Sequence, residues 1–434
     1  MTEGDLEERP RDVRRFLILC LVAIAAGVGI GFVGGGFRWC LDRVIECRDA
    51  LVTWAHTLEG WGWIVPVVVT GIGAALAALT VRWVPTAVGS GIPHVEAVSR
   101  GEAAPPTLAV LPAKFIGGLL SIGSGLVLGR EGPTVHMGAV IGTEAARLAR
   151  RDDADVRLMQ TSIGGAGLAV AFNAPIGGAL FVFEEVTKSF RPRVIVPTLL
   201  GVAVAVGCAR LIMGDGADFT VPEVPTPVLA LLPAFAVFGI LTGLLGALYN
   251  RIIVGSLDVV DRLTRIPAIV KAAMIGGLVG LALFIDPLTV GDGDSLSQLV
   301  LGGGTFAIPL LLVYFAVRFL AGPISYAAGT PGGLFAPLLA VGALWGVLFA
   351  WLVELVVPGQ SLGIPMAIVG MAAFFGATVR APLTGIVLVI EMTTITSVTV
   401  PMLVATGCAL IAAMLVRSAP IYDTLRERSA ASRH

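Results

Sequence analysis

Long apolar segments recur along this chain, and they constrain its fold more than any other feature. We count roughly eleven or twelve of them. Segments of about 20 apolar residues are long enough to cross the hydrocarbon core of a bilayer. Apolar residues make up 56% of the chain and charged residues only 14%, whereas about 25% of a soluble domain is charged. The sequence therefore predicts an all-α polytopic membrane protein. Clear segments are 16–36, 63–84, 194–213, 228–250, 268–285, 306–321, 338–357 and 396–416.

The composition also argues against several functional classes. A net charge of −1 does not suit a nucleic-acid-binding surface. An enzyme within the membrane would need a Ser/His pair, paired aspartates or a metal site, and the four histidines do not supply one. We therefore expect no enzymatic activity, no metal ion and no cofactor.

The charges of the loops predict the orientation of the chain in the membrane. Loops 187–193 and 251–271 are basic or rich in basic residues, whereas loops 214–226 and 286–297 carry acids and no base. This alternation over three consecutive spans follows the positive-inside rule. It places residues 184–193 at the cytoplasmic face, and the basic C-terminal tail indicates the same side. We expect both termini to be cytoplasmic, in short tails.

Two halves of the chain resemble each other in an ordered series of motifs. The same glycine, proline and basic positions recur, which chance similarity between apolar segments does not easily explain. We therefore expect one transmembrane domain over 1–434, with a first repeat at roughly 16–213 and a second at roughly 228–422. The matching pairs are AKFIGG (113–118) with VRFLAG (317–322), GREGP (129–133) with GLFAP (333–337), and APIGGALFVFEE (174–185) with APLTGIVLVIEM (381–392).

Breaks at 129–133 and 333–337 interrupt apolar segments at equivalent positions of the repeats. In each, glycines precede a proline that fits the first turn of a new helix, where its missing N–H is tolerated. Transporters built from repeats bind substrate near the bilayer midplane, between broken helices. Two facing helix N-termini would present free N–H groups and positive dipole ends, which attract an anion. A third break at 88–97 places Ser90 between glycines, and its hydroxyl can donate to a small anion.

Several charged residues near these breaks suit an anion pathway. The carboxylate of Glu131 precedes an expected helix start, so it can mimic an anion there and release the site when protonated. Lys114 and Arg130 either shape the field near the path or pair structurally with carbonyls and carboxylates.

Glu184 and Glu185 end an apolar segment at the cytoplasmic face, and we expect Glu184 to mark the water interface. His94 and His136 are expected to be hydrogen-bonded helix residues without a metal, and Glu96 and Glu391 to be buried partners in polar networks.

At these residues the chain resembles the CLC family of chloride channels and chloride/proton exchangers. GSGIP (89–93), GREGP (129–133) and GGLFAP (332–337) are similar to the three signature motifs of that family. The resemblance extends from about residue 16 to Tyr422. It implies the CLC fold, with two inverted-topology repeats and broken or re-entrant helices that meet at the midplane. We expect a minimal, prokaryotic-type member without C-terminal CBS domains. The positions that carry the motifs are Gly89, Gly91, Ile92, Pro93, Gly129, Arg130, Gly132, Pro133, Gly333, Ala336 and Pro337.

The resemblance implies a role for individual residues. Ser90 and Tyr422 would contact the central chloride, and Leu334 and Phe335 would offer backbone N–H groups to it. Glu131 matches the gating glutamate, and Glu185 matches the internal glutamate that receives protons from the cytoplasm in exchangers. The resemblance also implies a homodimer with one pathway per subunit, in the prokaryotic plasma membrane.

These residues predict proton-coupled chloride antiport, with a passive voltage- or pH-gated chloride channel of the same fold as the alternative. Family channels often lack an acid at the position of Glu185, which favours the exchanger. Ser90 and Tyr422 fit the chloride-selective pattern, so a fluoride/proton antiporter is less favoured. A sodium-coupled amino-acid carrier with broken helices comes from another class, and the chain lacks its motifs. Sodium-dependent uptake without chloride flux would favour that carrier.

Overall fold

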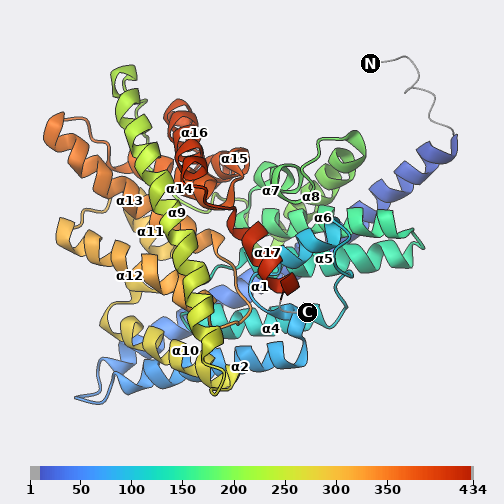
Figure 1. Cartoon of the computed structure of the whole chain (residues 1–434), viewed down its shortest axis with the longest axis horizontal. Helices are drawn as coiled ribbons and strands as arrows, with labels where there is room; N and C mark the ends of the chain where they lie inside the picture. Colours follow the sequence, from blue (N-terminus) through green and yellow to red (C-terminus); the bar gives the residue numbers. More distant parts are fainter. Residues whose placement is uncertain (1–9, 432–434) are drawn as a thin grey trace.

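The chain folds into seventeen α-helices within residues 10–431, which are the residues that this computed structural model describes (Figure 1). The outermost ends of both expected cytoplasmic tails, 1–9 and 432–434, lie outside the described residues. No β-strand occurs in the described part, and one isolated antiparallel bridge joins Gly129 to Gly333. The all-helical fold predicted from the apolar segments is confirmed.

The first half of the chain forms eight α-helices, and the second half forms nine. In order, the first half contains α1 (Pro10–Ala55), α2 (Ile64–Trp83), α3 (Ile92–Ser99), α4 (Val110–Gly123), α5 (Glu131–Leu148), α6 (Asp153–Phe172), α7 (Pro175–Phe181) and α8 (Pro192–Met213). The second half contains α9 (Leu232–Arg262), α10 (Ala268–Ile285), α11 (Asp294–Leu301), α12 (Ile308–Tyr326), α13 (Phe335–Val356), α14 (Gly363–Val379), α15 (Pro382–Thr393), α16 (Thr399–Leu415) and α17 (Ile421–Ala431).

Only some of the apolar segments are long enough to cross a bilayer as one helix. Seven helices in the described residues meet that condition, and α4, α14, α15 and α16 are apolar but shorter. The segment 16–36 belongs to α1, a single helix that continues to Ala55. The candidate span of 43 residues is about 65 Å long, which is about twice the thickness of a hydrocarbon core of about 30 Å.

The two halves repeat the same pattern of helix contacts. In the first half, α1 packs along α8 and α5 along α6; in the second, α9 packs along α16 and α13 along α14. Helices α2 and α10, which hold equivalent places, pack on each other and join the halves. Figure 1 shows this pair at the bottom of the view, with α2 in blue beside α10 in yellow. The same two kinds of helix contact therefore occur once in each half.

Glycines allow the closest of these helix pairs. A Cβ on Gly138 or Gly142 of α5 would lie 2.2 or 2.3 Å from a backbone oxygen of α6. A Cβ on Gly342 or Gly346 of α13 would lie 2.4 or 2.0 Å from a backbone oxygen of α14. Small residues four apart let membrane helices approach closely enough for backbone packing. The same spacing therefore fixes both pairs, and these pairs hold the starts of α5 and α13 in place.

Candidate functional site

The loops before α5 and α13 are joined by two backbone hydrogen bonds. The Gly129 N–H donates to the Gly333 carbonyl at 2.9 Å, and the Gly333 N–H donates to the Gly129 carbonyl at 2.8 Å. Helix α5 begins two residues after Gly129, and α13 begins two residues after Gly333. The N-termini of two helices from different halves therefore meet in the interior, as the motif spacing predicts.

Glu131 places its carboxylate at the start of α13, which belongs to the other half of the chain. Its Oε1 accepts a hydrogen bond from the Phe335 N–H at 2.6 Å. Glu131 is fully buried, and its Oε2 has no hydrogen-bond partner among the described residues. A carboxylate at a helix N-terminus is stabilised by the free N–H groups and the helix dipole. Here the carboxylate occupies the kind of place that the loop chemistry predicts for an anion.

The backbone closes tightly around this carboxylate and around the Ser90 loop. A Cβ on Gly129 would lie 2.0 Å from a Glu131 oxygen, and one on Gly333 would lie 2.1 Å from the other. A Cβ on Gly132 would lie 2.7 Å from the Cα of Ser90. Gly129 and Gly333 therefore allow the backbone to approach the Glu131 carboxylate, and Gly132 allows the start of α5 to approach the backbone of Ser90.

Ser90 lies in a turn that the structure supports from two sides. It is fully buried, and its Oγ accepts a hydrogen bond from the Ile92 N–H at 3.3 Å. Lys114 of α4 donates from Nζ to the Gly89 carbonyl at 2.6 Å. Gly91, with a φ of 84°, is the N-cap of α3, and Pro93 occupies the first turn. The sequence left two roles open for Lys114, shaping the field near the path or structural pairing, and the structure shows pairing with a backbone carbonyl.

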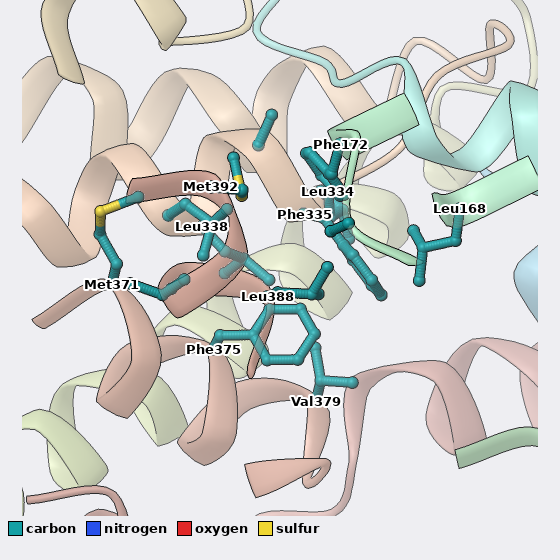
Figure 2. Packing of buried hydrophobic residues seen from close by; sticks show 14 of the residues in the cluster. Leu168, Phe172, Leu334, Phe335, Leu338, Met371, Phe375, Val379, Leu388 and Met392 are labelled. Atoms are coloured by element: carbon teal, nitrogen blue, oxygen red, sulfur yellow. The ribbon is translucent and has the colours of Figure 1, made fainter. Parts of the chain in front are cut away.

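Phe335 and Tyr422 form the aromatic part of the site. Figure 2 shows Phe335 among the labelled side chains Phe172 and Phe375, and the centroids of the Phe335 and Phe375 rings are 4.6 Å apart. The Tyr422 ring, from α17, lies 5.6 Å from the Phe335 ring. The Tyr422 hydroxyl is buried and has no hydrogen-bond partner among the described residues. Buried hydroxyls are usually hydrogen-bonded, so a bound anion would satisfy this one.

Glu185 lies apart from the loops that carry Glu131 and Ser90. It belongs to a π-helical turn, Val182–Val186, that directly follows α7, and it is 3% exposed. No hydrogen bond among the described residues links it to the Glu131 loop. Tyr422 is within electrostatic range of both Glu131 and Glu185. The second buried acid near Glu185 is Glu96 of α3, both of whose oxygens lack a partner in the described part.

Arg130 is paired with acids from two different loops. Its Nη1 pairs with Asp294 at 2.9 Å, its Nη2 with Asp218 at 3.3 Å, and its Nε donates to the Ala171 carbonyl at 2.9 Å. Asp218 and Asp294 come from the acid-bearing loops 214–226 and 286–297, which the charge pattern assigned to one side of the membrane. For Arg130 the structure therefore shows pairing with carboxylates and a carbonyl.

Glu184 and Glu391 bind each other's helix starts. Glu184 accepts hydrogen bonds from the N–H groups of Leu383 and Thr384 at 3.0 and 2.7 Å, at the beginning of α15. Glu391 of α15 accepts from the Ile176 and Gly177 N–H groups at 3.0 and 2.7 Å, at the beginning of α7. The expectation that Glu184 only marks the water interface is wrong, because its carboxylate caps a helix of the other half.

The two histidines near the site form a hydrogen-bonded pair, as expected of them. His94 Nδ1 and His136 Nε2 are 3.0 Å apart, and His94 Nε2 contacts the Ala104 carbonyl at 3.1 Å. A carbonyl only accepts, so the neutral His94 donates from Nε2, and His136 then donates from Nε2 to His94 Nδ1. The pair ties α3 to α5 close to the Ser90 loop.

Asp423 holds α17, and with it Tyr422, against the neighbouring loops. It pairs with Arg100 at 2.9 Å, with Arg426 at 3.2 Å and with Lys188 at 3.5 Å. Burial raises the pKa of Asp423, but Lys188, Arg426 and Arg100 outweigh it and hold the pKa below its ordinary value of 3.8. The ion pairs therefore stabilise the fold above that value and are lost only as the pH falls through the lowered pKa.

With this geometry established, the comparisons with known proteins identify the family. The sequence model of the voltage gated chloride channel family matches residues 72–414. The chain belongs to the CLC family. A curated relative from Vibrio cholerae serotype O1 (strain M66-2), named H(+)/Cl(-) exchange transporter ClcA, is 37% identical to it over 430 residues. That match covers 96% of this chain and 91% of the relative.

Solved structures of CLC proteins share the fold. A slow cyanobacterial Cl-/H+ antiporter superimposes with a TM-score of 0.91 at 32% identity, covering 95% of this chain and 98% of that one. A eukaryotic CLC transporter superimposes with a TM-score of 0.76 at 22% identity, covering 94% of this chain and 74% of that one. The CLC fold expected from the motifs is confirmed, and the chain is an integral multi-pass membrane protein.

The sequence did not reveal the partners of three residues, Arg130, Glu184 and Glu391. It gave no partner for Arg130, although Asp218 and Asp294 stand in the two loops without a base. It also missed the caps made by Glu184 and Glu391, although the aligned repeats place both acids at the same register. The charge pattern of the loops could have indicated the partners of Arg130, and the repeat offset could have indicated the two caps.

Proposed function

We propose that this CLC protein exchanges chloride for protons across a membrane. The observation that carries the proposal is the hydrogen bond from the Phe335 N–H to the Glu131 carboxylate. A carboxylate that occupies an anion position at a helix N-terminus competes with chloride when ionised and leaves when protonated. One group then serves both ions, and transport of the two is coupled. The names of the ClcA relatives support this function.

Each site residue has a proposed part in the exchange. Ser90 and Tyr422 contact the central chloride with their hydroxyls, and Leu334 and Phe335 offer backbone N–H groups once the Glu131 carboxylate has left. Glu185 passes protons between the cytoplasm and Glu131. The unpartnered hydroxyl of Tyr422 and the unpartnered Glu131 Oε2 support this assignment, because buried polar atoms without partners suit a place that an ion visits.

The remaining features of the proposal concern assembly and location. Chloride and protons are the transported species, no cofactor or metal takes part, and no nucleic acid is bound. The chain functions in a lipid bilayer as a homodimer with one pathway per subunit. It lies in the prokaryotic plasma membrane with both termini cytoplasmic, as one transmembrane domain divided into the repeats 16–213 and 228–422.

Simultaneous ion fluxes from proteoliposomes test the proposal. Purified protein is reconstituted, a chloride gradient is imposed with valinomycin and potassium present, and chloride and proton movements are recorded together. An exchanger drives protons uphill as chloride runs down its gradient. Chloride flux without proton movement would instead identify the passive channel. Sodium-dependent amino-acid uptake with no chloride flux would identify a carrier of another class.

A further inference from the structure

The loop before α11 has the same backbone design as the loop that carries Ser90. Asp292 lies between Gly291 and Gly293, whose φ angles are 74° and 105°. Ser90 likewise lies between two glycines, with φ angles of 58° and 84°. In both loops the middle side chain accepts a hydrogen bond from the N–H two residues further on, at 3.3 Å for Ser90 and 3.2 Å for Asp292. Asp292 is therefore the counterpart of Ser90 in the second half.

A buried cation supports each of these loops in the same way. Lys114 of α4 donates to the Gly89 carbonyl at 2.6 Å. Arg318 of α12 donates to the Gly291 carbonyl at 3.4 Å. Lys114 and Arg318 are 0% and 2% exposed, and they hold equivalent positions in the repeated motifs. The structure thus contains two copies of one loop, and the copies differ in the charge of their side chains.

The charge difference reverses what the second loop does to an anion. A serine hydroxyl is neutral and can donate a hydrogen bond, whereas an ionised carboxylate only accepts. Asp292 therefore repels an anion at the position where Ser90 attracts one. The second loop carries a further carboxylate at Asp294, where the first loop has an apolar residue, Ile92.

Asp294 also restrains the cation nearest to the Glu131 gate. Its carboxylate pairs with Arg130 Nη1 at 2.9 Å, while Asp218 and the Ala171 carbonyl hold the rest of the guanidinium. The Arg130 side chain is only 6% exposed. A guanidinium that is paired in this way adds little attraction for an incoming anion, because the carboxylates cancel its field.

A cavity of 230 Å³ opens beside Arg130 on the face formed by the acidic loop 286–297. Its walls contain four acids and three arginines, a balance that disfavours an anion in the cavity. A cleft lined by one sign of charge changes the local concentration and the rate of arrival of a small ion by tenfold or more, and the arginines among these acids make the expected effect smaller here. The acids are Asp42, Glu46, Asp292 and Asp294, and the arginines are Arg48, Arg130 and Arg318.

We propose that Asp292 and Asp294 form an electrostatic barrier that limits how readily chloride reaches the Glu131 gate from the extracellular side. Asp294 is a positioning residue that acts through Arg130, and Asp292 repels the anion from the loop that copies the Ser90 loop. This inference rests on the proposed chloride transport and on the extracellular assignment of loop 286–297. According to this inference, Asp292 and Asp294 lower the apparent affinity for chloride on the extracellular side and leave the affinity on the cytoplasmic side unchanged.

Chloride uptake into membrane vesicles of both orientations tests the barrier. Initial rates are measured against chloride concentration in right-side-out and inside-out vesicles, which expose the extracellular and cytoplasmic faces to the bath. Asp294→Asn should lower the apparent KM for chloride about three- to tenfold in right-side-out vesicles, with no change in inside-out vesicles. Asp292→Ser, which copies the first loop, should shift the KM in the same direction.

Two controls separate the charge effect from a structural one. Asp294→Glu keeps the charge and should retain the wild-type external KM, and Glu59→Gln removes an exposed acid that does not line the cavity and should leave the external KM close to that of the wild type. The KM difference between wild type and Asp294→Asn should also shrink at high concentration of an impermeant salt, because the Debye length falls from about 10 Å at 0.1 M to about 3 Å at 1 M.

The barrier is contradicted if Asp294→Asn and Asp292→Ser both leave the external KM unchanged, or if the KM shifts equally on both faces. A shift that is insensitive to salt would contradict it as well. Absence of chloride flux in the wild-type protein would contradict the proposed function instead, so the two failures are distinguishable.

Discussion

Glu131 binds the backbone of the residue that corresponds to it in the other half. The Glu131 Oε1 accepts from the Phe335 N–H at 2.6 Å, and the two residues are 204 positions apart, which is the offset of the repeated motifs. Phe335 therefore supplies the N–H group, and Glu131 supplies the asymmetric carboxylate. In the proposed exchange, the pseudo-symmetric helix starts make the anion site, and one acid turns that site into a proton-sensitive gate.

The fit of the carboxylate depends on Gly333. In Gly333→Ala the new Cβ would lie 2.1 Å from Glu131 Oε1 and 2.8 Å from the Gly132 nitrogen, so the carboxylate must leave its place. We expect loss of proton coupling with persistent chloride flux. Gly363→Ala, where nothing lies within 4 Å of the new Cβ, should transport as wild type.

A thermal unfolding cycle checks that Gly333→Ala acts through Glu131. Adding Glu131→Ala removes the clashing oxygens, so the second substitution should recover part of the melting temperature lost in Gly333→Ala. The steric explanation would be refuted if the effects of the two substitutions on the melting temperature were strictly additive. Unchanged coupling of protons to chloride in Gly333→Ala would refute it as well.

The hydroxyl of Tyr422 should contribute to chloride binding, and its ring should contribute separately by preventing uncoupled chloride leak. Tyr422→Phe keeps the ring that packs 5.6 Å from Phe335 and removes a hydroxyl without a protein partner, so stability should be retained. Chloride binding should weaken by about tenfold or more, because a hydrogen bond to a charged group contributes about 1.5–3 kcal/mol. Tyr422→Ala also removes the ring and should allow uncoupled chloride leak. Calorimetric chloride titration and coupled flux measure the two effects, and equal behaviour of both variants would contradict the separation.

The crossed caps of Glu184 and Glu391 should stabilise α7 and α15 together. Glu184→Gln or Glu391→Gln should each lower the free energy of unfolding by about 1–2 kcal/mol, because a charged cap with two N–H donors is lost. The double variant should lose less than the sum, since each cap holds the same pair of helices. Thermal unfolding in detergent measures this, with Glu59→Gln as an exposed control. Independent, fully additive losses would show that the caps do not act as a unit.

Glu185 should be required for protons and not for chloride. Glu185→Val replaces a carboxyl group with an apolar side chain that cannot carry a proton, and it leaves the anion site intact. Chloride flux should therefore persist with little proton movement. Dual-electrode recording from liposomes gives the ratio of the two fluxes. Uphill proton pumping at the wild-type ratio in this variant would remove Glu185 from the proton pathway.

The sequence predicted the helix starts at the site well, because glycine and proline determine them locally. Pro93, Pro133 and Pro337 all lie in the first turn of a helix, as the motifs indicated. The repeat offset also predicted that Glu131 and Phe335 occupy equivalent places. What it could not predict is that the carboxylate crosses to the other half, because that contact depends on how α5 and α13 pack.

The polar partners were harder to predict for the same reason. Arg130 and Asp294 are far apart in the sequence, and only tertiary packing brings them to 2.9 Å. Glu184 was interpreted as a mark of the water interface because it ends an apolar segment. Its hydrogen bonds to the start of α15 depend on the crossing of α7 and α15, which no local pattern encodes.

The Glu131→Gln variant tests the central claim most directly. Glutamine is neutral, so it cannot replace the ionised carboxylate at the start of α13 or carry a proton. Wild-type and variant liposomes receive the same chloride gradient, and external pH and chloride are followed together. The account predicts uphill proton movement in the wild type and chloride flux without proton movement in Glu131→Gln. Proton transport that stays in step with chloride in the variant would contradict it.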